Sequence, residues 1–295
     1  MDVGTVGIWT GQLEFQRAAA AREVAAELDE LGYGALWVPE AVGREAISHA
    51  SLLLDASERI VVATGVANIY NRTPAAAAYA QRLLADDSGG RFLLGLGVSH
   101  GPMVEGMLNQ SWSKPYSRMV EYLDAMDGAF TVSPAPAEDA PRVLAALGPR
   151  MLALAADRSW GALTYFVPVE HAAVAREHLG TGPMLMVEQA AVLSTDAAVA
   201  RDAARKHMQM YLTLPNYVNN LRRLGWGDDD FAGGGSDALV DALVAWGDAS
   251  AIAARVAAQH EAGADHVCVQ VLDTDTTALP LEQWRELAPA LVPGR

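Results

Sequence analysis

Residues 31–38, LGYGALWV, join the end of an amphipathic helix to the start of a buried strand, and this pattern decides the fold. Gly32 follows the helix, where glycine readily adopts the left-handed conformation that ends helices, and an apolar run then enters the core. The same order of residues recurs as SGGRFLLG (88–95), SWGALTYF (159–166) and AGADHVCV (262–269). A chain that repeats helix, glycine and apolar strand predicts an α/β fold with parallel strands.

Apolar runs at eight places predict eight strands. We expect strands at residues 6–9, 35–39, 59–66, 92–96, 142–146, 162–166, 184–193 and 266–272, and helices at 17–31, from Pro74, at 114–130, after Pro149, and at 170–179, 196–212 and 252–262. Eight strands that alternate with helices in one chain predict a (β/α)8 TIM barrel. A Rossmann-like open sheet is the alternative, and it is weakened because no G-x-G-x-x-G follows the first strand.

Residues 213–236 do not fit the repeat, and they include the flexible run Gly233-Gly234-Gly235. We expect an insertion there, before the last βα unit and near the barrel mouth, within a single domain of residues 1–295. Its aromatic residues Tyr217 and Trp226 either shape a pocket or pack against the barrel, and the sequence favours neither.

Composition limits the classes of partner. Hydrophobic residues make up 51% of the chain, enough for a sizeable core, and no apolar run reaches the roughly 20 residues of a membrane span. The net charge of −15 argues against nucleic acid and anionic membranes as partners, so an anionic cofactor needs a local cradle of N–H groups and arginines. The single cysteine, Cys268, and an N-terminus without signal features predict a cytoplasmic protein.

In a TIM barrel, the functional residues follow the C-terminal ends of the strands. That rule selects Thr10–Gln12, Pro39–Ala41, Gly65–Asn68, Gly97–His100 and Leu147–Arg150. Each segment alone reads as an ordinary loop. Their expected convergence on one rim favours a binding site.

The segment LGLGVSH (94–100) carries the most chemistry. Gly95 and Gly97 lack a Cβ and would let a ligand ring lie against the backbone. Ser99 can donate a hydrogen bond, and His100 titrates near neutral pH. His100 is therefore a candidate catalytic or cofactor-facing residue, with a simple helix cap as the alternative.

Two further loops carry polar groups after apolar strands. Asn68, Asn71 and Arg72 follow the third strand, a position suited to binding rather than to a core. Residues 148–151, GPRM, begin a helix, and its free N–H groups together with Arg150 form a plausible phosphate-binding site. The alternative is an exposed arginine at an ordinary helix start.

No metal site is expected, because His171 and His178 lie seven residues apart without an HExxH pattern, and Cys268 reads as a core residue.

At these rim segments the sequence resembles the luciferase-like oxidoreductase superfamily, and within it the actinobacterial branch that depends on coenzyme F420. The resemblance covers almost the whole chain. It rests on ELGYGALWVPE (30–40), ATGVANIYNRTPAAAA (63–78), GGRFLLGLGVSH (89–100), LAALGPRMLALAADRSWGALTYF (144–166) and EAGADHVCVQVL (261–272).

The resemblance implies a homodimeric barrel with a deazaflavin or flavin at its C-terminal rim. It also implies a non-prolyl cis peptide at Gly65-Val66 that buttresses the cofactor ring. The cofactor-binding residues that it implies, around the ring and at the phosphate, are Gly65, Val66, Ala67, Asn68, Gly97, Val98, Ser99, Leu147, Gly148, Pro149 and Arg150.

The chain departs from the family pattern at two positions. Relatives often carry Asp-His after the second strand where this chain has Glu40-Ala41, and some carry an acidic residue after the fourth strand where it has His100. We therefore expect His100 to be the general acid or base, with Glu40 as second choice or as the group that orients His100.

The predicted function is F420-dependent hydride transfer to or from a small organic substrate. An FMN-dependent monooxygenase is the alternative, and a paralogue without activity is the third.

Overall fold

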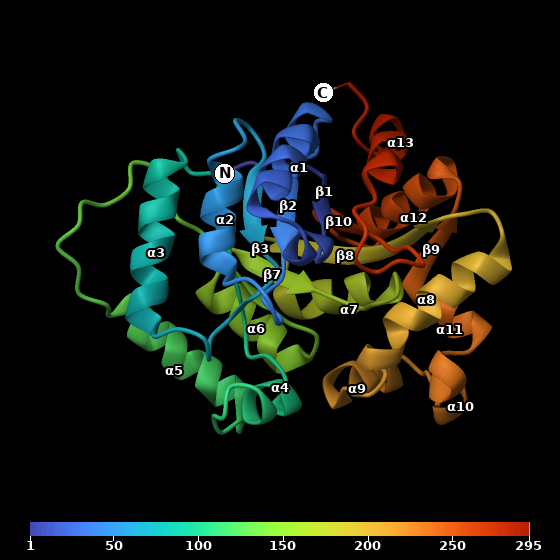
Figure 1. Ribbon diagram of the computed structural model, residues 1–295. Helices are drawn as coiled ribbons and strands as arrows, with labels where there is room; N and C mark the ends of the chain where they lie inside the picture. Colours follow the sequence, from blue (N-terminus) through green and yellow to red (C-terminus); the bar gives the residue numbers. More distant parts are fainter. Residues whose placement is uncertain (295) are drawn as a thin grey trace.

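A computed structural model describes residues 1–294, and its centre is a closed barrel of eight parallel strands (Figure 1). The barrel strands follow one another in the order β1, β2, β3, β5, β6, β7, β8 and β10, and β10 pairs with both β8 and β1 to close the ring. The strands are β1 (Val6–Trp9), β2 (Ala35–Val38), β3 (Val61–Thr64), β4 (Ala67–Asn68), β5 (Phe92–Gly97), β6 (Arg142–Ala145), β7 (Gly161–Thr164), β8 (Met184–Leu193), β9 (Val244–Gly247) and β10 (His266–Val271). The predicted TIM barrel is confirmed.

Helices cover the outside of the barrel, as Figure 1 shows. They are α1 (Ala18–Glu30), α2 (Ala46–Leu54), α3 (Pro74–Asp87), α4 (Gly101–Gly106), α5 (Pro115–Asp127), α6 (Pro149–Arg158), α7 (Glu170–Leu179), α8 (Ala197–Tyr211), α9 (Pro215–Arg223), α10 (Asp228–Phe231), α11 (Asp237–Leu243), α12 (Ala249–Glu261) and α13 (Leu281–Leu291), with 3-10 turns η1 (Gln12–Phe15) and η2 (Ala232–Gly234). Within the described residues, none of these helices has the length and apolar character needed to span a membrane.

The interior of the barrel is a packed core rather than a channel. Side chains from successive strands fill it, among them the fully buried Trp37, Leu93, Met186 and Cys268. Cys268 is thus the core residue that the sequence indicates. Trp37 donates from Nε1 to Nε2 of His266 at 3.0 Å, and burial lowers the pKa of His266 to about 4. The neutral imidazole therefore ties two strands together inside the barrel.

The third strand is shorter than predicted. Residues 59–66 read as one continuous strand, but β3 ends at Thr64, a cis peptide joins Gly65 to Val66, and β4 then pairs with the end of β5. Thr64 and Gly95 approach closely, because a Cβ on Gly95 would lie 2.0 Å from the Thr64 carbonyl oxygen. Gly95 is required by this contact between strands, so the expectation that it makes room for a ligand ring is wrong.

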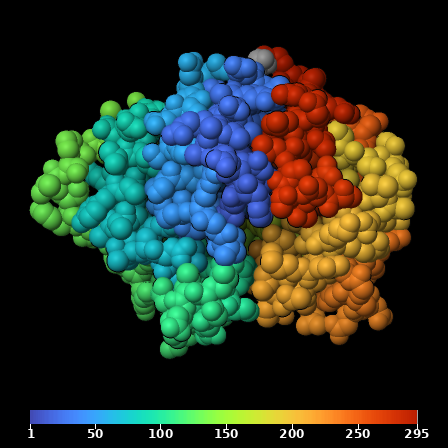
Figure 2. Space-filling view, viewed as in Figure 1, coloured from blue at the N-terminus to red at the C-terminus, as the bar shows by residue number. Residues whose placement is uncertain are grey.

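Several elements were not predicted, among them α2, α4, α11, α13 and β9. Helices α2 and α4 follow β2 and β5, and β9 pairs with Ala190–Leu193 at the end of β8. Residues 213–236, expected as an insertion, contain α9, α10 and η2. In Figure 1 the helices α9 and α4 lie at the same edge of the barrel, and Figure 2 shows a notch between the corresponding surfaces.

Candidate functional site

A pocket of about 900 Å³ opens at the C-terminal end of the barrel strands. Among the residues predicted for the site, Glu40, Gly65, Val66, Asn68, Gly97, Ser99 and His100 line it. Ala67 and Val98 are their direct neighbours in the chain. Leu147–Arg150 follow β6 at the same end of the barrel, but they do not line this pocket. Gly11, Gln12, Pro39 and Ala41 from the first two predicted loops line it as well, so four of the five loops at the strand ends meet around one cavity.

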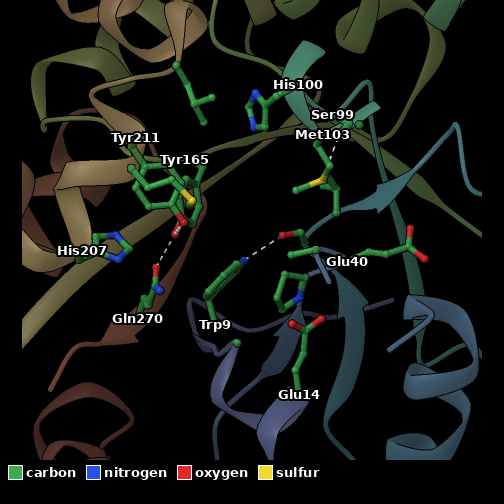
Figure 3. Close-up of a pocket in the computed structure, with 18 of the residues that line it drawn as sticks. Trp9, Glu14, Glu40, Ser99, His100, Met103, Tyr165, His207, Tyr211 and Gln270 are labelled. Carbon is green, nitrogen blue, oxygen red and sulfur yellow. Dashed lines mark hydrogen bonds between the residues drawn. The ribbon is translucent and has the colours of Figure 1, made fainter. Parts of the chain in front are cut away.

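The backbone at Gly65-Val66 forms a bulge that Trp9 holds from below (Figure 3). Trp9 Nε1 donates to the Gly65 carbonyl oxygen at 3.0 Å. A Cβ on Gly97 would lie 2.4 Å from Cγ2 of Val66, so the missing side chain of Gly97 makes space for Val66. Gly97 still lines the pocket, but its first role is to let the bulge approach β5.

Glu40 fixes the same bulge from the other side. Its carboxylate accepts hydrogen bonds from the Asn68 backbone N–H at 2.6 Å and the Ala46 N–H at 3.2 Å, and it forms a short ion pair with Arg72. Arg72 also donates from Nη1 to the Asn68 carbonyl oxygen at 3.0 Å. Burial opposes the charge of Arg72, but the carboxylates of Glu40 and Glu45 outweigh it and raise its pKa.

The side chains of Glu40 and Arg72 are only 3% and 8% exposed. A carboxylate bound by a buried guanidinium and two backbone N–H groups is an anchor, because its lone pairs are already occupied. No hydrogen bond among the described residues joins Glu40 to His100.

His100 lies at the start of α4 with its side chain free of the helix. It occupies the residue before the first helical turn, yet its side chain makes no capping hydrogen bond. The ring lies 5.5 Å from the ring of Tyr217, centroid to centroid, and its side chain is hydrogen-bonded to Asn216. Burial lowers the pKa of His100 and the bond to Asn216 opposes that shift, so the imidazole is neutral at pH 7.

Ser99 precedes His100 in the left-handed conformation, with φ of 54°. Its hydroxyl faces Sδ of Met103 at 3.4 Å. The left-handed turn redirects the chain between β5 and α4, and it places His100 at the pocket.

Aromatic rings form the other side of the pocket, and of these the sequence singled out only Tyr217, as a residue that either shapes a pocket or packs against the barrel. We call the cluster of Tyr165, Phe166, His207, Tyr211 and Tyr217 the aromatic wall. Its centroid distances include 4.9 Å for His207 and Tyr211, 5.0 Å for Phe166 and Tyr211, and 5.3 Å for Tyr211 and Tyr217. All of these residues except Phe166 line the cavity. Figure 3 shows His207, Tyr165 and Tyr211 on one side of the cavity, where Trp9 meets the wall with its ring 5.2 Å from that of Tyr165, centroid to centroid.

A directed chain of hydrogen bonds runs along this wall. Tyr165 donates its hydroxyl proton to Oε1 of Gln270 at 2.8 Å, and the hydroxyls of Tyr165 and Tyr211 lie 2.9 Å apart. Because the only proton of the Tyr165 hydroxyl is used, Tyr211 must donate to Tyr165. The Tyr211 oxygen therefore keeps a lone pair for another partner.

Two buried titratable groups accompany the wall. Burial lowers the pKa of His207 to about 4, and its Nε2 atom is buried without a hydrogen-bond partner among the described residues. Burial also raises the pKa of Glu188 to about 8, although the hydrogen bond of 3.1 Å that its carboxyl group accepts from the Phe166 N–H acts to lower it. Both side chains are uncharged at neutral pH.

The predicted phosphate seat lies beside α9. Gly148 precedes α6 and no side chain caps that helix. Nη2 of Arg223 lies 3.3 Å from the position that a Cβ on Gly148 would take. Arg150 is exposed, and its guanidinium lies over the ring of Tyr116 at 4.2 Å. Arg223, from the segment expected as an insertion, thus adds a cation that the sequence did not indicate.

The sequence profile of the family described as luciferase-like monooxygenase matches residues 2–266. The chain belongs to this family. The barrel, the cis peptide at Gly65-Val66 and the resemblance that the rim segments carry agree with that membership.

Individual relatives of this luciferase-like chain differ in their named cofactors. Rv3520c of Mycobacterium tuberculosis, provisionally named a coenzyme F420-dependent oxidoreductase, is 34% identical over 119 residues, which cover 40% of this chain and 33% of that protein. An F420-dependent secondary alcohol dehydrogenase solved with an F420-acetone adduct superposes with a TM-score of 0.77 at 15% identity, over 97% of this chain and 98% of the other.

The FMN complex of the oxygenating constituent of 3,6-diketocamphane monooxygenase from Pseudomonas putida superposes with a TM-score of 0.66 at 15% identity, over 96% of each chain. At these identities the solved structures show a shared fold.

Proposed function

We propose that this chain is a coenzyme F420-dependent oxidoreductase that transfers hydride between the deazaflavin and a small organic substrate. The observation that carries the proposal is the backbone bulge at Gly65-Val66, held by Trp9 and Glu40, which lines the same pocket as His100. The partial match to the mycobacterial protein named for F420 supports the choice of cofactor. Cys268, the single thiol, suits the reducing cytoplasm in which we place the enzyme.

The described residues fit such a cofactor. The ring would lie at Gly65–Asn68 and Gly97–Ser99, where the backbone lines the cavity. The anionic tail would bind at Leu147–Arg150, where Gly148 exposes backbone beside the guanidinium of Arg223. When bound, the deazaflavin supplies the hydride chemistry at its ring carbon.

We assign to His100 the transfer of the substrate's hydroxyl proton. Its lowered pKa keeps it neutral at pH 7, so it can accept a proton from a substrate hydroxyl and return it in the reverse direction. Asn216 orients the ring through its hydrogen bond. We assign Glu40 a positioning role, because Arg72 and two N–H groups already bind its carboxylate.

An FMN-dependent monooxygenase is the second candidate, and the FMN-bound structural neighbour favours it. Titrating the purified chain separately with coenzyme F420 and with FMN, and following cofactor fluorescence, decides between them. We expect micromolar binding of F420. Micromolar binding of FMN without binding of F420 would end the first proposal.

A matched pair of arginine variants locates the cofactor tail in the same titration. Arg223→Ala removes the cation beside Gly148 and should weaken F420 binding about tenfold or more. Arg222→Ala removes an exposed partner of Asp228 and should leave F420 binding unchanged. Equal affinity in the two variants would remove Leu147–Arg150 from the proposed site.

We also propose that the chain is a homodimer. An exposed apolar surface on α3 and the loop after α5 holds Tyr79, Leu83, Phe130 and Val132, which are 46–88% exposed. In Figure 1, α3 and the loop after α5 lie at the left of the molecule. Size exclusion with light scattering should give twice the 31.2 kDa chain mass, and Leu83→Glu should halve it, whereas Val199→Glu on α8 should not.

A further inference from the structure

The aromatic wall has no part in the proposed hydride and proton transfer, although it forms much of the pocket. Its rings belong to the residues directly after β7, to α8 and to α9, so three separate parts of the chain meet there. Contacts between the rings at 4.9–5.4 Å create a broad apolar surface that favours flat ring compounds.

The mouth of the pocket is apolar as well. Phe15, Met107 and Met210 line it, and these side chains are 64%, 55% and 58% exposed. Large hydrophobic side chains that gather at one opening mark a surface that meets an apolar ligand, because water alone would disfavour them there. Methionines at such an opening adapt to ligands of different shape.

The charged groups at the pocket disfavour anions. Lys206 is the one lysine or arginine among the described lining residues, and it is exposed, whereas Glu14, Glu40 and Asp273 also line the cavity. Arg72 compensates Glu40. A substrate that carries a phosphate or carboxylate into this pocket would meet more negative than positive charge.

Two polar atoms interrupt the apolar surface. The lone pair of Tyr211 remains free because its proton goes to Tyr165, whose own proton goes to Gln270. Nε2 of His207 is buried without a partner, and the ring of His207 is 4.9 Å from that of Tyr211. A buried polar atom without a hydrogen bond is rare in native proteins, and a ligand group that pairs with it removes its cost.

We propose that the aromatic wall binds an uncharged ring compound through a hydroxyl group that donates a hydrogen bond to the Tyr211 oxygen and contacts His207. This hydroxyl is separate from the substrate group whose proton His100 accepts. This compound class is the substrate of the proposed oxidoreductase, and in that respect the inference rests on the proposed function. The binding itself requires no cofactor. Apolar rings give the affinity, and the Tyr211 oxygen selects the hydroxyl.

Three probes of the same ring size test the proposal: 2-naphthol, naphthalene and 2-naphthoate. Each is titrated into the full chain at pH 7, with and without coenzyme F420, and binding is followed by isothermal titration calorimetry. We expect 2-naphthol to bind about tenfold more tightly than naphthalene and still more tightly than 2-naphthoate. Equal or tighter binding of 2-naphthoate would overturn the proposal.

A conservative variant separates the hydroxyl from the ring. Tyr211→Phe keeps the ring and removes the oxygen, so 2-naphthol should lose about tenfold in affinity while naphthalene is unchanged. Tyr79→Phe on the exposed face of α3 is the matched control and should alter neither. Unchanged binding of 2-naphthol by Tyr211→Phe would show that Tyr211 does not select the ligand.

The F420 titration is independent of these measurements. If F420 does not bind but 2-naphthol binding depends on Tyr211, the proposed function fails and the ligand class stands. If F420 binds but 2-naphthoate binds as tightly as 2-naphthol, the ligand class fails and the proposed function stands.

Discussion

The two sides of the pocket are built on different physical principles. On one side, which we call the bulge wall, Trp9, Glu40 and Arg72 hold Gly65–Asn68 through hydrogen bonds and an ion pair. On the other side, the aromatic wall contacts the cavity with rings. The Tyr211 oxygen keeps one lone pair there, and Nε2 of His207 has no hydrogen-bond partner among the described residues.

From this difference we infer that one side binds the cofactor and the other binds the substrate. A hydrogen-bonded backbone keeps one geometry, which suits a cofactor that is the same in every turnover. Rings and methionines contribute mostly apolar contact area, which tolerates variation in a substrate and depends less on direction. His100 belongs to the rim of the first side and touches Tyr217 of the second, so it lies where the two sides meet.

The largest effect is expected at that meeting point. His100→Ala removes the proposed proton acceptor, so kcat with a turnover substrate should fall by about 10²–10⁴-fold while F420 affinity is largely kept. His178→Ala, on the exposed face of α7, serves as the control and should keep full activity. Unchanged turnover by His100→Ala would support a paralogue without this chemistry.

Substitutions in the bulge wall should lower the free energy of unfolding more than substitutions in the aromatic wall. Arg72→Ala leaves the buried carboxylate of Glu40 without its charged partner, so the free energy of unfolding should fall by about 3–5 kcal/mol. Arg118→Ala removes an exposed ion pair with Glu121 and should cost no more than about 1 kcal/mol. Urea denaturation of both variants measures the difference, and similar losses would mean that the buried pair does not hold the bulge.

A smaller change at the bulge wall tests its packing. Gly97→Ala places a methyl group 2.4 Å from Cγ2 of Val66, so the bulge must move, and we expect a loss of about 1–3 kcal/mol together with weaker F420 binding. Gly182→Ala has open space around the new Cβ and should change neither quantity. Normal F420 affinity in Gly97→Ala would show that the cofactor does not rest on the bulge.

Local sequence signals predicted the barrel and half of the pocket. Glycines before apolar runs located the strands, and the strand ends then located Gly65, Ser99 and His100. The break after Thr64 escaped prediction because it depends on the approach of Gly95 from another strand. The ion pair of Glu40 and Arg72 joins residues that are 32 positions apart, and neither local segment indicates the other.

The aromatic wall escaped prediction for the same physical reason. Tyr165 follows β7, Tyr211 lies in an amphipathic helix, and Tyr217 lies in the segment expected as an insertion. Tyr165 and Tyr211 read as ordinary core residues until the closed barrel brings them together, and for Tyr217 the sequence left a pocket role and packing against the barrel open. Arg223 is similar, because its place beside Gly148 depends on how α9 packs.

The smallest expected effect is the change in unfolding free energy at acidic pH that His207 of the aromatic wall causes. Burial lowers the pKa of His207 to about 4, so protonation is less favourable in the folded than in the unfolded chain. The stability that this residue contributes is complete above pH 6.5 and is lost as the pH falls from 6.5 toward 4.

His207→Phe keeps a ring and removes the titration. Between pH 7.5 and 5.5 the wild-type chain should lose about 1 kcal/mol more unfolding free energy than His207→Phe, because His49 and His266 titrate in both proteins and cancel in the comparison. Urea denaturation at the two pH values measures the difference. An identical pH dependence would mean that His207 is hydrated, and the aromatic wall would then be less dry and less selective for uncharged rings than its contacts indicate.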